Sequence, residues 1–103
     1  MLKRGSIKVP KIIKRYRYAK LKTITKISDT NYMDWKWRRK YIGFIGELFI
    51  LQSEEKFPGQ HYLYFTNHRL NWITTGYGEY KTDKNKLIMT TKNSIYEFEI
   101  IEE

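Results

Sequence analysis

The sequence predicts a single, mainly β domain: a small antiparallel barrel or sandwich of about five strands, preceded by a basic N-terminal arm. The chain has 103 residues, enough for one hydrophobic core. Short segments of alternating apolar and polar residues are separated by turns rich in Gly, Asn and Asp. No apolar stripe with helical spacing extends beyond two turns. We therefore divide the chain into an arm, residues 1–16, and a β domain, residues 17–103.

The arm is basic and is interrupted by Pro10. Proline removes a backbone donor and favours extended geometry at the preceding residue, Val9. We expect an extended segment that becomes ordered on a partner, with Arg15 among its contacts.

Residues 17–27 alternate as a half-solvated strand does. One predicted face carries Ala19, Leu21, Thr23, Thr25 and Ile27. The other carries Lys20, Lys22 and Lys26, together with Ile24. We expect the second face to be a row of ammonium groups in solvent.

Residues 32–40 fit either a loop or a short helical turn, and residues 41–51 are the most apolar segment. Gly43 and Gly46 predict a curved central strand with a bulge in that segment. Further strands are expected at 61–65, 70–74, 87–91 and 95–101. The last two form a hairpin around Lys92-Asn93, with Asn93 at positive φ. In the last strand, Tyr96, Phe98 and Ile100 are predicted to face the core.

The charge is unevenly distributed along the chain. The net charge is +9, yet residues 1–40 have 14 Lys/Arg against 2 Asp/Glu, whereas residues 41–103 have 6 against 9. Polyanions respond to local fields, so this asymmetry indicates an anionic partner that binds the N-terminal half. The alternative is a solvated, solubilising face.

Aromatic and cationic residues interleave in Trp35-Lys36-Trp37-Arg38-Arg39-Lys40. Binding of single-stranded nucleic acid uses both kinds, because cations follow the phosphates and aromatic faces stack on bases. The phosphate backbone of the same nucleic acid is expected to contact five cations at the end of the arm and along the first strand: Arg15, Arg17, Lys20, Lys22 and Lys26. Tyr77 and Tyr80 flank glycines and are predicted to be exposed contacts. The alternative for each Trp is a core anchor, and strand residues Tyr62, Tyr64 and Tyr96 are expected in the core.

Catalysis is not expected, and neither is a metal or cofactor. The chain has no cysteine, nucleophile elbow or phosphate-cradling glycine loop. His61 and His68 lack a carboxylate motif that would complete a metal site. His61, Glu79 and Arg69 are the residues that a ribonuclease-type acid–base site would use, but nothing in their spacing selects them.

The segment Lys40–Leu48, with Gly43 and Gly46, resembles the turn and strand of SH3-like barrels of the ribosomal KOW type. The resemblance implies a non-catalytic domain that binds RNA or protein. The chain departs from a compact KOW unit in its long arm and in an insertion between Gln52 and Gln60.

The segments Leu70–Thr75 and Thr91–Phe98 resemble short accessory proteins of bacteriophages and mobile elements from AT-rich hosts. Such proteins commonly bind and block a host machine. The leading hypothesis is therefore a phage-encoded module that contacts RNA, DNA or a host protein–nucleic acid complex in the bacterial cytoplasm. The alternatives are a protein-targeting inhibitor of host defence, of the anti-CRISPR type, and a ribosome- or virion-associated structural protein. No apolar run reaches the roughly 18 residues of a membrane span, so no membrane partner is expected.

Overall fold

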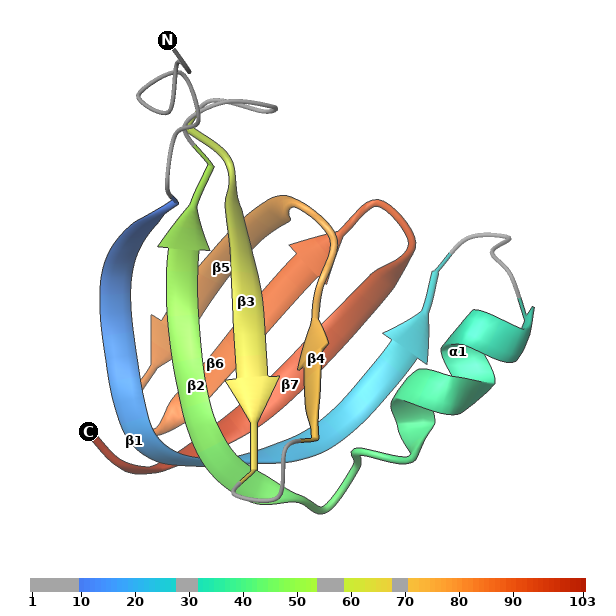
Figure 1. The fold of residues 1–103 in the computed structure, drawn as a ribbon, viewed down its shortest axis with the longest axis horizontal. Helices are drawn as coiled ribbons and strands as arrows, with labels where there is room; N and C mark the ends of the chain where they lie inside the picture. Colours follow the sequence, from blue (N-terminus) through green and yellow to red (C-terminus); the bar gives the residue numbers. More distant parts are fainter. Residues whose placement is uncertain (1–9, 28–31, 54–58, 68–70) are drawn as a thin grey trace, which may run out of the picture.

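The computed structural model describes residues 10–27, 32–53, 59–67 and 71–103. It contains seven strands and one helix (Figure 1). The elements are β1 (Lys11–Lys26), α1 (Tyr32–Arg39), β2 (Ile45–Gln52), β3 (His61–Thr66), β4 (Trp72–Thr74), β5 (Gly78–Asp83), β6 (Lys86–Thr91) and β7 (Ser94–Glu102). The prediction of a mainly β, antiparallel fold is confirmed.

The strands form one antiparallel sheet that curls until its ends meet. The order is β2-β1-β7-β6-β5-β3-β4, and β2 also pairs with β3. The long strand β1 pairs with β2 along its first part and with β7 along its second part. In Figure 1, β2, β3 and β4 lie in front of β5, β6 and β7, and β1 curves from one layer to the other. The junction of β3 with β5 is the narrowest, since it consists of the single pair His61 and Gly78.

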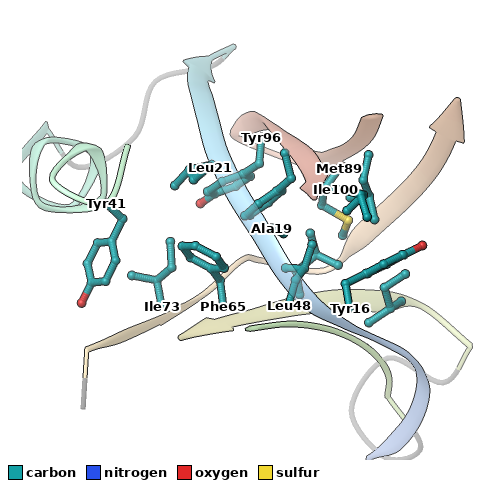
Figure 2. Packing of buried hydrophobic residues seen from close by; sticks show 14 of the residues in the cluster. Tyr16, Ala19, Leu21, Tyr41, Leu48, Phe65, Ile73, Met89, Tyr96 and Ile100 are labelled. Carbon is teal, nitrogen blue, oxygen red and sulfur yellow. The ribbon is translucent and has the colours of Figure 1, made fainter. Parts of the chain in front are cut away.

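The core lies between these two layers, where the alternating residues of both meet (Figure 2). Its largest fully buried side chains are Phe65, Phe98, Leu21, Leu48, Ile50, Leu63, Ile73, Leu87 and Met89. The phenyl rings of Phe65 and Phe98, from opposite layers, pack edge to face with centroids 5.2 Å apart. As predicted, Tyr96, Phe98 and Ile100 face inward along β7.

Irregular pairing along β1 changes which of its residues face the core. The register shifts between Tyr16 and Ala19 against β2, and between Leu21 and Thr23 against β7. Each extra residue reverses the inside–outside alternation in the next part of the strand. The predicted faces are therefore wrong beyond Leu21: Ile24 is buried, whereas Thr23, Thr25 and Ile27 are exposed.

The predicted arm boundary at residue 16 is wrong as well. Residues 11–16 are the first part of β1 and pair with β2, and Tyr16 is a core residue. Pro10 stands immediately before the strand, where a missing backbone donor interrupts no pairing. Residues 1–9 of the predicted arm lie outside the described residues. The strand number rises to seven mainly because residues 78–83, where no strand was predicted, form β5.

Glycine positions explain the entry to β2. Gly43 has φ +97° in the turn after α1, so the strand begins at Ile45 and not at Tyr41. At Gly46, an added Cβ would stand 2.1 Å from the carbonyl oxygen of Thr66, so only glycine permits this approach to the end of β3. The predicted bulge in this segment is found in β1 instead.

The β6–β7 hairpin is confirmed, although its turn is built differently from the prediction. The hydroxyl of Thr91 donates to the carbonyl of Ser94 and accepts from its backbone N–H, each at 3.1 Å. Among the described residues, Lys84 is the only non-glycine residue at positive φ, so the expectation for Asn93 is wrong. No helix in the described part of the chain is long and apolar enough to cross a membrane.

Candidate nucleic-acid interface

The cations along the middle of β1 are paired with carboxylates. Strand β7 runs antiparallel beside β1 and brings the acidic C-terminal end of the chain against the basic N-terminal end. The nitrogen–oxygen distances are 3.0 Å for Lys14 and Glu103, 3.9 Å for Arg17 and Glu102, and 3.7 Å for Lys22 and Glu99. On the other side, Arg15 pairs with Glu47 of β2, its Nε lying 2.8 Å from the carboxylate. Of the predicted row of ammonium groups, Lys22 is paired with a carboxylate, whereas Lys20 and Lys26 form no ion pair with a described carboxylate.

Lys20, also predicted as a contact, is half-buried and lies between Ile45 of β2 and Glu99 of β7 in the strand register. It therefore belongs with the central, carboxylate-flanked part of β1. Lys26, at the exposed end of the strand, lies next to α1 and belongs to a different surface.

A second group of cations gathers around helix α1. We define the cationic ridge as Lys26, Lys36, Arg39 and Lys40. The first lies at the end of β1, and the others lie on α1 and the turn after it; all four are exposed. Within the residues that the structure describes, no carboxylate forms an ion pair with any of the four. Positions 36 and 40 are one helical turn apart, so their side chains project from the same side.

Trp35 and Trp37 border the ridge. The indole of Trp35 is half-buried, with the guanidinium of Arg39 4.9 Å and the ammonium of Lys26 5.8 Å from its centroid. Such cation–π contacts hold the cations over a ring without neutralising their charge. Trp37 is 43% exposed and packs edge to face on Tyr41, with 5.5 Å between centroids. The two tryptophans therefore differ. Trp35 packs against the core cluster, as a core anchor does, whereas Trp37 is largely open to solvent, as a contact residue is.

Arg38 differs from its neighbours because it faces inward. Its guanidinium donates to the carbonyl of Thr74 and to the hydroxyl of Tyr96, the latter at 3.2 Å. The hydroxyl of Tyr41 donates to the carbonyl of Trp72 at 3.1 Å. The bonds from Arg38 to Thr74 and from Tyr41 to Trp72 satisfy alternate carbonyls of β4. They hold α1 and the turn after it against the sheet. Arg38 thus holds α1 against the sheet, and it also lines a depression next to Trp35.

A groove begins beside Trp35 and continues to the narrow β3–β5 junction. It consists of two adjoining depressions of about 160 and 760 Å³ that share Tyr77, Thr91 and Lys92. The smaller depression includes Trp35, and the larger includes Tyr80. The predicted contacts Tyr77 and Tyr80 therefore lie in one groove beside the ridge. Both are half-buried, so the prediction of exposure holds only in part.

Two residues of the alternative acid–base site, His61 and Glu79, line the groove. His61 lines its larger depression and packs edge to face on Tyr80, with 5.1 Å between centroids. Glu79 lines the same depression, whereas His68 and Arg69 lie outside the described residues. No group of three or more His, Cys, Asp or Glu suited to a metal occurs in the described ranges.

An aromatic surface that was not predicted from the sequence lies on the outside of β2, β3 and β4. Tyr62 and Tyr64 were expected in the core, but they are half-buried and alternate with the core residues Leu63 and Phe65. That expectation is wrong because both faces of β3 are aromatic or apolar, and such a run has no period that separates inside from outside. We define the outer aromatic row as Phe49, Tyr64 and Trp72.

Burial and pairing shift the pKa of three groups. Burial is the main cause that raises the pKa of the Tyr16 and Tyr62 phenols above 10.0. The hydrogen bond from Lys14 to Glu103, followed by their charge attraction, raises the pKa of Lys14 above 10.5. None of these groups belongs to the cationic ridge.

No known family model, curated protein or solved structure matches the chain.

Proposed function

We propose that the protein is a non-catalytic binding protein, encoded by a phage and acting in the cytoplasm of its bacterial host. Its partner is nucleic acid, RNA or DNA, either free or held in a host complex. The contact surface is the cationic ridge and the groove beside it. The observation that carries this proposal is a contrast in pairing. No described carboxylate forms an ion pair with a ridge cation, whereas four cations earlier in β1 have such partners: Lys14, Arg15, Arg17 and Lys22.

The local field supports an anionic ligand. Four exposed cations within one helix and one strand end attract phosphates most strongly where no carboxylate offsets them. The groove adds Lys92 together with the aromatic side chains of Trp35, Tyr77 and Tyr80. The resemblance of Lys40–Leu48 to KOW-type, SH3-like domains supports the same class of partner, because this segment connects the ridge to β2.

Fluorescence anisotropy with labelled single-stranded RNA, single-stranded DNA and duplex DNA, at several salt concentrations, tests the proposal. The test variant is Lys36→Gln/Arg39→Gln/Lys40→Gln, which leaves Arg38 in place. For a single strand, each phosphate contact contributes roughly 0.7 to the slope of log affinity against log salt concentration. We expect the slope to fall by about 2 and the affinity to fall at least about tenfold at low salt.

The matched control is Lys14→Gln/Arg17→Gln/Lys22→Gln, which removes the same number of charges from the paired cations of β1. We expect it to retain most of the wild-type affinity. Absence of binding at low salt would contradict the proposal. Equal weakening by both variants would mean that net charge, and not the ridge, controls binding.

A protein partner is the second candidate, with inhibition of a host defence system as the function. A specific observation favours it: Tyr18, Ile45 and Ile101 are exposed around the middle of β1, away from the ridge. Exposed apolar residues that cluster on one face are typical of protein interfaces. A stoichiometric complex with one host protein, lost on Tyr18→Ala/Ile101→Ala and formed without nucleic acid, would support this candidate.

A further inference from the structure

We propose that the outer aromatic row is a stacking surface for bases, so that the nucleic acid bound by the cationic ridge is single-stranded. This inference rests on the proposed function, and it assigns a role to a surface outside both the ridge and the groove.

The row is built by strand register. Phe49 of β2 is directly opposite Tyr64 of β3, and Trp72 of β4 lies diagonally next to Tyr64. The ring centroids are 5.8 Å apart in both contacts. The planes of Tyr64 and Trp72 are only 21° from parallel, so these two rings form a flat step on the sheet. Trp72 is 50% exposed and carries most of the accessible aromatic surface of the step.

The row adjoins the ridge through the anchoring contacts of α1. The hydroxyl of Tyr41 donates to the backbone carbonyl of Trp72, and the ring of Trp37 packs on the ring of Tyr41. Trp37 follows Lys36 in the helix and is 43% exposed, whereas Tyr41, which links it to Trp72, is only 8% exposed. At the far end of the row, the guanidinium of Arg15 lies 6.0 Å from the ring of Phe49.

Charge decides which occupant suits this surface. The rings of the row are uncharged. The ridge on one side of them is cationic, and no described carboxylate forms an ion pair with its cations, whereas Arg15 at the far end of the row is paired with Glu47. A single strand matches both properties, since its phosphates follow cations while its bases offer π faces to aromatic side chains. A duplex stacks its bases on one another and presents only base edges in its grooves. Its phosphates can therefore contact the ridge, but its bases cannot stack on the row.

An oligonucleotide that lacks its bases separates this inference from the proposed function. The three probes are a labelled single-stranded DNA, an abasic single strand of the same length and phosphate number, and a duplex. The ridge binds all three through phosphates. If bases stack on the row, the wild-type protein binds the base-containing strand at least about fivefold more tightly than the abasic strand.

Trp72→Ala is expected to abolish that preference while leaving the affinity for the abasic strand unchanged. Ile101→Ala, at a position of matched exposure (51%) far from the row in the strand register, is the control and is expected to retain the preference. Trp72→Leu keeps an apolar side chain without a π face, and it is also expected to abolish the preference. It replaces Trp72→Ala in the test if the alanine variant folds poorly.

Equal wild-type affinity for the base-containing and abasic strands would overturn the inference and leave the proposed function standing. A preference for bases that survives in a folded Trp72→Leu variant would also overturn it. Absence of binding to all three probes at low salt would instead contradict the proposed function itself.

Discussion

The middle of β1 and helix α1 are both strongly basic in sequence, yet their surroundings differ. Along β1, the partners of Lys14, Arg17 and Lys22 come from residues 99–103, at the other end of the chain. Around α1, Lys36 and Lys40 are exposed, and no described carboxylate pairs with them. The comparison teaches that a charged segment attracts a polyanion only if the fold leaves its charge uncompensated.

The largest expected effect separates Arg38 from the exposed cations of the same helix. Arg38→Ala is expected to lower the free energy of unfolding by about 2–3 kcal/mol, because it leaves Thr74 and Tyr96 without a charged hydrogen-bond donor. Arg39→Ala, at the exposed neighbouring position, is expected to cost less than about 1 kcal/mol. Urea denaturation of both variants measures the difference. Similar losses would show that Arg38 does not fasten the helix.

The second prediction removes the compensation from β1. Glu99→Gln/Glu102→Gln releases Lys22 and Arg17 from their ion pairs. We expect β1 to gain affinity for single-stranded DNA, with the salt slope steeper by roughly 1.4, since each cation contributes about 0.7. The change in stability is expected to stay below about 1 kcal/mol per pair.

Asp83→Asn/Glu97→Gln is the control for that experiment, because it removes the same number of negative charges outside the pairs with β1. We expect this control to change the slope of log affinity against log salt concentration less than Glu99→Gln/Glu102→Gln does. A gain of equal size in both variants would indicate that net charge governs binding, and the distinction between the two regions would fail.

The third prediction concerns alkaline pH. Burial raises the pKa of Tyr16 above 10.0, so the folded state retains this proton at pH values where the unfolded chain loses it. The stabilisation from Tyr16 is fully present below about pH 10 and is lost as pH rises through its raised pKa. Denaturant midpoints measured between pH 9 and about 11 are expected to fall less steeply in Tyr16→Phe than in the wild type. Identical slopes would mean that Tyr16 does not titrate on unfolding in this range.

The smallest effect is expected from a single exposed ion pair. Lys14→Gln breaks the contact with Glu103, in which both side chains are well exposed. We expect almost no change in the urea midpoint, since solvent screens such pairs. A clear fall in the midpoint would show that the paired cations of β1 stabilise the sheet more than surface charges do.

Much of the fold was accessible from local patterns. The β6–β7 hairpin and the inward face of Tyr96, Phe98 and Ile100 follow from strict alternation in a regular strand. Within the irregular strand β1, the inward face was predicted correctly only for Ala19 and Leu21, because a register shift depends on which strands pair and leaves no mark in composition.

The candidate site was predicted in part. The aromatic–cationic segment of α1 was found from composition, and so were the groove residues Tyr77 and Tyr80. The inward direction of Arg38 was not accessible, because it depends on where β4 and β7 offer acceptors. Phe49, Tyr64 and Trp72 were missed because they come together only through cross-strand pairing.

The sequence by itself determined the antiparallel β character, the basic N-terminal half and the aromatic richness of the chain. Only the tertiary structure decided where positive charge remains uncompensated and where aromatic rings meet. The physical reason is that charge compensation and ring contact act over a few ångströms. Closure of the sheet brings residues from opposite ends of the chain to that distance, as it does for Lys14 and Glu103, which are 89 positions apart in sequence.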